Sequence, residues 1–222
     1  MKKEEPVQEF LRLSGVIGNY EVSCNALENR DQLDDDTVLK STYFLAHGKG
    51  KTPQDVRIIP PSVTTIILNP NKTLKENDLE SIRKLFLPDV PLILIPLVHN
   101  NHWSLLYYRS ETNLWVSMDS LSPYHSRLVD AFPTLLYKKG LLGEGMLPPK
   151  GVHKFTGLVR QPGGWECGSY TLLFVQMVLT AKSDAEIQER ISLLSEKTRI
   201  ALTQILLTYF KQDASKKRQR NT

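Results

Sequence analysis

The sequence predicts a single α+β domain, in which a mostly antiparallel central sheet is flanked by helices. Three short apolar segments lie together near the middle of the chain, at 91–98, 102–109 and 113–119, and only brief polar turns separate them. Segments with apolar residues at helical spacing come before and after this cluster. Strands gathered in the centre with helices on either side are typical of the α+β class.

The first half of the chain contains three predicted elements before the strands. "DDDTVLKSTYFLAHGKG" predicts a helix, because three acids stand in its first turn and Gly48 ends it. "SVTTIIL" (62–68) indicates a strand by its β-branched residues, although its short length leaves a buried helix open. "KENDLESIRKLF" (75–86) predicts a second helix from its apolar spacing.

The second half continues with a helix, a strand and two more helices. "SRLVDAFPTLLYKKGLL" (126–142) indicates a helix despite Pro133, and "VHKFTGLV" (152–159) indicates a fourth strand. Apolar spacing then predicts helices at about 168–181 and 197–211.

These elements define a domain at 21–211, after a loosely ordered lead-in at 1–20. Residues 212–222 form a basic polar segment, which we interpret as a disordered solubilising tail. A nuclear-import or nucleic-acid role for this tail is the alternative.

Composition narrows the class of protein. The 222 residues are 41% apolar and 23% charged, as in ordinary globular domains. The first residues lack the apolar core of a signal peptide, and "VPLILIPLV" is too short to cross a bilayer, so we expect a cytoplasmic or nuclear protein. Cys24 and Cys167 are the only cysteines, too few for a disulfide framework and without a CxxC pair for zinc.

Cys167 lies between a Gly/Pro-rich turn and a long apolar run in "RQPGGWECGSYTLLFVQMVL". If the run is a helix, Cys167 lies in its first turn, where free backbone N–H groups and the helix dipole favour a thiolate. The alternative is a buried structural cysteine, which is the commoner fate of this residue.

Three polar residues at the ends of predicted elements supply the other groups that a cysteine hydrolase needs. His102 opens one predicted strand and Asp119 closes the next, so an antiparallel hairpin would place imidazole and carboxylate side by side. Gln161 stands six residues before Cys167 across a flexible turn, from which its amide could reach an oxyanion together with the Cys167 N–H. Each residue taken alone could be an ordinary turn, cap or loop residue.

The chain resembles the ubiquitin-like-protein-specific cysteine proteases, the sentrin/SUMO-protease and deneddylase family. The resemblance rests on "HW" at 102–103, "DS" at 119–120 and "QPGGWECG" at 161–168, in that order. It implies the papain-like fold with His-Asp-Gln-Cys order: Cys167 as nucleophile, His102 as base, Asp119 as its orienter and Gln161 as oxyanion donor. No cofactor or metal is implied.

The same resemblance implies how substrate binds. Trp103 would cover the groove for the modifier's Gly-Gly tail, and Asp35, in "QLDD", would contact that tail; the alternatives are a core aromatic and a helix N-terminal acid. Gln32 stands where the family has a second tunnel tryptophan, and Trp165 and Glu166 replace its usual Tyr and Asp. The family is helical at 62–68, and we follow it over the strand propensity.

We therefore expect a cysteine protease that cleaves after the Gly-Gly of a ubiquitin-like modifier, in precursor processing or in removal from lysine. The compact chain favours the neddylation modifier over SUMO. An acyltransferase with the same triad and a non-catalytic modifier-binding module are the alternatives. We expect a monomer that binds neither membranes nor nucleic acid.

Overall fold

The fold is that of a computed structural model of the chain. The structure describes residues 27, 32–69, 73–87, 89–122, 126–143, 146 and 150–220, with side chains of the last helix described to 211. The whole of the expected lead-in at 1–20, and Cys24, lie outside the described residues.

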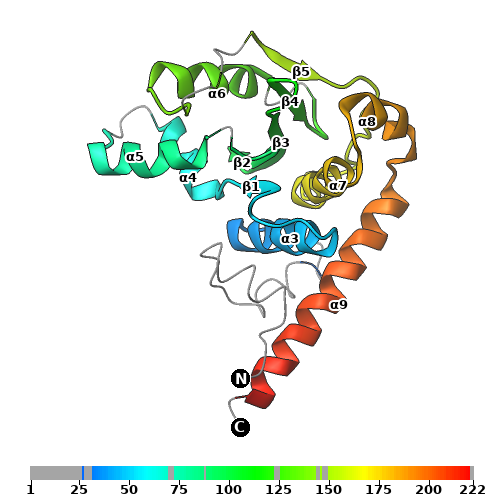
Figure 1. The fold of residues 1–222 in the computed structure, drawn as a ribbon. Helices are drawn as coiled ribbons and strands as arrows, with labels where there is room; N and C mark the ends of the chain where they lie inside the picture. The colour runs from blue at the N-terminus through cyan, green and yellow to red at the C-terminus, as the bar shows by residue number, and fades with distance from the viewer. Residues whose placement is uncertain are drawn as a thin grey trace.

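A five-stranded sheet in the order β1-β2-β3-β4-β5 forms the centre of the fold (Figure 1). Its three longer strands, β2 (Leu92–His99), β3 (His102–Arg109) and β4 (Leu114–Met118), are sequential and antiparallel. The short outer strands β1 (Val56–Ile58) and β5 (Val152–Lys154) pair in parallel with β2 and β4. The α+β prediction with a mostly antiparallel sheet is confirmed.

Helices cover both faces of this sheet (Figure 1). One face packs against α3 (Asp35–Gly48), α7 (Cys167–Thr180) and α9 (Glu196–Arg220). The other packs against α4 (Pro61–Leu68), α5 (Glu76–Leu85) and α6 (Ser126–Lys138), which keeps Pro133 within it. Because both faces are buried, β2 and β3 carry nearly continuous apolar runs.

The segment "SVTTIIL" is helical, so the strand indicated by its propensity is wrong and the helix implied by the resemblance is right. Pro61 stands in the first turn of α4, where a proline is favoured because the missing N–H has no helical partner. Thr64 and Thr65 donate their hydroxyls to the Pro61 carbonyl at 2.7 and 3.1 Å, which accommodates β-branched residues in a helix.

Three further differences concern short or terminal elements. The predicted strand 152–159 is limited to β5, and neither β1 nor the helix α8 (Asp184–Arg190) was predicted. The last helix continues to Arg220, through the segment expected to be a disordered tail. That segment contains no Gly or Pro, and its basic residues suit the negative end of a helix dipole.

Candidate active site

The β2-β3-β4 meander brings His102 and Asp119 together. A two-residue turn at Asn100 and Asn101, both with positive φ, connects β2 to β3 so that His102 is the first residue of β3. Asp119 directly follows β4, the antiparallel neighbour of β3. His102 Nε2 lies 2.7 Å from Asp119 Oδ1, and both side chains are buried.

Cys167 is the first residue of α7 and is fully buried. The first backbone bond of this helix runs from the Tyr170 N–H to the Glu166 carbonyl, which leaves the N–H groups ahead of it without helical partners. The Cys167 thiol lies 4.0 Å from the carbonyl oxygen of Asn101 in the β2-β3 turn. The start of the helix is thus held beside the end of the sheet that carries His102.

The imidazole of His102 interacts with both Asp119 and Cys167. Burial lowers the pKa of His102, but hydrogen bonds and charge from Asp119 and Cys167 outweigh burial and raise the pKa to about 9. Since Nε2 carries the Asp119 bond, the other ring nitrogen, Nδ1, is left for the thiol. The raised pKa favours the imidazolium form of His102 beside the Cys167 side chain.

Gln161 is buried beside Ser120, the residue after Asp119. Its Oε1 accepts a hydrogen bond from Ser120 Oγ at 2.6 Å, and its Nε2 donates to the Gly163 carbonyl at 2.6 Å. The amide nitrogen carries a second hydrogen, which is the group needed for an oxyanion donor. In this structure the side-chain amide of Gln161 therefore makes its hydrogen bonds with Ser120 and Gly163.

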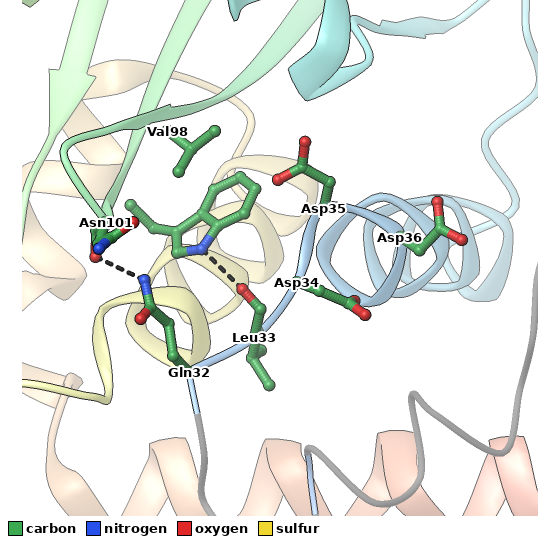
Figure 2. A pocket seen from close by; sticks show the side chains of 8 residues that line it. Gln32, Leu33, Asp34, Asp35, Asp36, Val98 and Asn101 are labelled. Carbon is green, nitrogen blue, oxygen red and sulfur yellow. Dashed lines mark hydrogen bonds between the residues drawn. The ribbon is translucent and has the colours of Figure 1, made fainter.

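An open pocket of about 490 Å³ lies between the start of α3 and the β2-β3 hairpin, next to this cluster (Figure 2). Gln32 Nε2 donates to the Asn101 carbonyl at 2.7 Å, and Trp103 Nε1 donates to the Leu33 carbonyl at 2.9 Å. These two bonds tie the segment before α3 to the hairpin. Trp103 is 1% exposed, so it is a core aromatic and also lines the pocket.

Three consecutive acidic residues, Asp34, Asp35 and Asp36, line the pocket and make up its acidic wall. Figure 2 shows the Asp35 carboxylate on the side of Val98, while those of Asp34 and Asp36 point away from it. Asp34 is the N-cap of α3 and accepts a bond from the Thr37 N–H at 2.7 Å. Asp35 is the first helical residue, and its pKa is raised by burial and by its two acidic neighbours. Asp34 is therefore the capping residue, while Asp35 lines the pocket with a carboxyl that is partly desolvated but still accessible to solvent.

Two contacts of the site were not found by sequence reasoning. The Asn101 carbonyl is the common neighbour of the Gln32 amide and the Cys167 thiol. Leu33 packs so close to Gly168 that a Cβ atom on Gly168 would stand 2.9 Å from the Leu33 Cβ. The "NN" pair between two apolar runs was the available signal for the turn, while nothing local indicated the Leu33 contact.

The described part of the chain holds neither a candidate metal-binding cluster nor a membrane-spanning helix. No group of three or more His, Cys, Asp or Glu side chains there has an arrangement that could hold a metal ion. No helix within the same residues is long and apolar enough to span a membrane.

The sequence is similar to a family of proteases and to one of its curated members. The family model of the Ulp1 protease family, C-terminal catalytic domain, matches residues 70–207. A probable sentrin-specific protease 8 of Dictyostelium discoideum is 25% identical over 209 residues, which cover 86% of this chain and 82% of that protein.

Solved structures share the fold at low sequence identity. A de-sumoylating protease is 18% identical with a TM-score of 0.66, covering 90% of this chain and 89% of its own. The C-terminal Ulp1 protease domain, solved in complex with Smt3, the yeast ortholog of SUMO, is 16% identical with a TM-score of 0.62, covering 96% of both chains.

Proposed function

We propose that this chain, which belongs to the Ulp1 protease family of cysteine peptidases, cleaves the bond that follows the C-terminal Gly-Gly of a ubiquitin-like modifier. The observation that carries the proposal is the cluster of Cys167, His102 and Asp119, with Gln161 hydrogen-bonded to Ser120, the residue after Asp119. The family match over 70–207 contains one cysteine, Cys167, so the family chemistry has a single candidate nucleophile there.

In the proposed reaction the Cys167 thiolate attacks the carbonyl of the terminal glycine while His102 is protonated. The Cys167 backbone N–H and the Gln161 amide stabilise the oxyanion, and the imidazolium donates its proton to the leaving amine. Asp119 holds the ring through Nε2 and favours its charged form. Water then hydrolyses the thioester with His102 as base, which returns the free thiol.

The pocket between α3 and the hairpin is the proposed binding site for the modifier's tail. Asn101 lines this pocket, and its carbonyl is also next to the Cys167 thiol. The acidic wall suits a basic residue in the tail, since an arginine before Gly-Gly would pair with Asp35. Trp103 supplies an apolar wall, and Gln32 supplies an amide where the family has a tryptophan. We expect the small residues of the tail to lie beside this indole.

Among modifiers, we place the neddylation modifier first and SUMO second, either as precursors or as conjugates to lysine. The similarity to a probable sentrin-specific protease 8 and the Ulp1 domain bound to a SUMO ortholog support a modifier of this class without choosing between the two.

The decisive experiment is reaction of the purified chain with modifier probes that carry a C-terminal electrophile, using the neddylation modifier, SUMO and ubiquitin. We expect labelling at Cys167 with at least one probe, and cleavage of the matching modifier fusion. Cys167→Ala should abolish both, while Cys24→Ala serves as the matched control and keeps both.

Different results would reject different parts of the proposal. Labelling that persists in Cys167→Ala would exclude this nucleophile. Binding of a modifier without any turnover would indicate a binding module, and transfer of the modifier to an added amine in preference to water would indicate an acyltransferase. Faster cleavage of the SUMO fusion would reverse the order of modifiers while leaving the protease function in place.

A further inference from the structure

We propose that Ser120 is a positioning residue that holds the side-chain amide of Gln161 in the orientation needed to stabilise an oxyanion. This inference rests on the proposed function and adds to it a residue that does not touch the reacting atoms. Asp119 and Ser120 are adjacent residues. Asp119 orients His102, and the inference concerns Ser120.

Ser120 is 1% exposed and makes two contacts with Gln161, which is 41 residues away in the sequence. Its hydroxyl lies 2.6 Å from Gln161 Oε1, and its carbonyl accepts the backbone N–H of Gln161 at 3.2 Å. The side-chain contact and the backbone contact together fix both ends of the glutamine. Because the site is buried, water cannot replace a lost partner at low cost.

The direction of the Ser120 bond follows from the Gly163 carbonyl. A side-chain amide can in principle be turned over, so that its oxygen and nitrogen exchange places. Gly163 O is an acceptor only, and it lies 2.6 Å from the Gln161 nitrogen, so the nitrogen must face it. The oxygen therefore faces Ser120, whose hydroxyl must be the donor.

This arrangement matters because the two ends of an amide have opposite effects on an oxyanion. The N–H end stabilises negative charge, whereas the oxygen end repels it. Without the Ser120 hydroxyl, Oε1 would be a buried acceptor lacking its donor, and the amide would rotate to find another. Adjacent residues at the end of β4 thus hold the base and the oxyanion donor: Asp119 Oδ1 contacts His102, and Ser120 Oγ contacts Gln161.

The test is a double-mutant cycle, with kcat and KM measured on a modifier whose Gly-Gly is joined to a fluorogenic amine. Loss of an oxyanion donor in Gln161→Ala should lower kcat by about a hundredfold to a thousandfold. Ser120→Ala should lower kcat by roughly tenfold, as expected for one lost hydrogen bond, with KM nearly unchanged. In the Gln161→Ala protein, Ser120→Ala should have no further effect on kcat.

Controls separate positioning from folding. Ser117→Ala removes another buried serine, from β4 itself, and should leave kcat at the wild-type value. Ser120→Thr keeps the hydroxyl and should retain more kcat than Ser120→Ala at equal melting temperature. Equal fold-losses from Ser120→Ala in the wild-type and Gln161→Ala proteins, or an effect on KM alone, would overturn the inference.

A second measurement does not require turnover. The side-chain amide resonances of Gln161, assigned by their absence in Gln161→Ala, should shift and exchange faster with water in Ser120→Ala. Unchanged resonances would overturn the role of Ser120, whatever the kinetics show. If wild-type protein cleaves no modifier substrate but these resonances shift, the proposed function fails while the Ser120–Gln161 contact stands.

Discussion

Asp34 and Asp35 are neighbours in the sequence, but the structure gives their carboxylates different surroundings. Asp34 is the N-cap of α3, and its carboxylate accepts a hydrogen bond from the Thr37 N–H in the first turn. Asp35 makes no such capping bond, and burial together with Asp34 and Asp36 raises its pKa. A raised carboxyl pKa means that the ionised form is less favourable in the folded chain than in the unfolded one. Asp35 therefore weakens the fold at neutral pH, which is consistent with a binding role.

We predict that Asp35→Asn raises KM for the preferred modifier more than it lowers kcat, by a factor that shrinks as salt rises. Its free energy of unfolding at neutral pH should equal or exceed that of the wild type. Asp34→Ala, in contrast, should lower that free energy by about 1 kcal/mol through the lost cap. Urea unfolding and steady-state kinetics at low and high salt measure both effects. An unaltered KM for Asp35→Asn at low salt would remove Asp35 from the binding site.

His102 makes the stability of the fold depend on pH. Its pKa is about 9 in the folded chain against an ordinary value of 6.5, so the folded chain binds this proton more tightly than the unfolded chain. The stabilisation is complete below pH 6.5 and is lost as the pH rises through about 9. The groups responsible are Asp119 and Cys167, acting against burial.

We predict that the free energy of unfolding of the wild type falls between pH 6.5 and about 9, relative to that of His102→Ala. His153→Ala is the matched control, since His153 is exposed, and its curve should run parallel to the wild type. Asp119→Asn should make the free energy of unfolding fall less between pH 6.5 and about 9 than it does in the wild type, because the substitution removes a group that raises the pKa of His102. Parallel curves for wild type and His102→Ala would contradict the pKa assignment.

At the scale of elements, sequence reasoning succeeded where pairing is local. The strands that carry His102 and Asp119 are consecutive, and tight turns leave one antiparallel arrangement, so the proximity of the two side chains could be predicted. The assignment of catalytic roles to them remains a prediction. β1 and α8 were missed because they are short, with three and seven residues, and gain stability from distant partners.

Other parts of the site depend on contacts that no local pattern encodes. Gln32 and Asn101 are 69 residues apart, so neither their bond nor the shared carbonyl beside Cys167 could be predicted. The same holds for "SVTTIIL", where burial of Ile67 against the sheet outweighs strand propensity. Its signal was the proline pair ahead of it, which suits a helix start.

The contact between Leu33 and Gly168 joins the pocket wall to the helix that bears Cys167. A Cβ on Gly168 would stand 2.9, 3.1 and 3.3 Å from Leu33 Cβ, Cγ and Cδ1. Leu33 cannot turn away, because the nearest of these atoms is attached to its backbone and its carbonyl holds Trp103. Either α7 or the segment before α3 must therefore move.

We predict that Gly168→Ala lowers the free energy of unfolding by about 1–3 kcal/mol, as overpacking does, and reduces kcat/KM by more than that loss of fold explains. Gly48→Ala is the control, since a Cβ there meets nothing within 4 Å; it should not lower the free energy of unfolding and should leave kcat/KM unchanged. The measurements are urea unfolding and kinetics at a temperature where both variants are folded. Wild-type kcat/KM in Gly168→Ala would show that the contact does not control the site.

At the scale of the whole molecule, α9 connects the helices that carry the two halves of the site. Near its start, Glu196 accepts the Tyr170 hydroxyl of α7 at 2.8 Å and pairs with Arg199, whose side chain is buried. Further along, the Tyr209 ring stacks on Phe44 of α3 with centroids 3.8 Å apart. The helix thus braces α7, which bears Cys167, and α3, which bears the acidic wall (Figure 1).

We expect the stability of the domain to depend on the part of α9 up to Phe210 and not on the residues after it. Phe210 is fully buried and is the last buried side chain among those that the structure describes. Phe210→Ala should therefore cost about 3–5 kcal/mol and lower the melting temperature by roughly ten degrees or more. Ile205→Ala is the control on the same helix, because Ile205 is 57% exposed, and it should have a small effect.

Deleting residues 214–222 removes four basic residues beyond Phe210. Although this segment is helical to Arg220, we expect the deletion to leave the melting temperature within about two degrees of the wild type, because the packed part of α9 is retained. Turnover of a modifier substrate should also be retained. A fall as large as that of Phe210→Ala would show that the basic end of α9 packs on the domain. An unchanged melting temperature with a raised KM would instead assign the basic end to substrate binding, through charge on the modifier's surface.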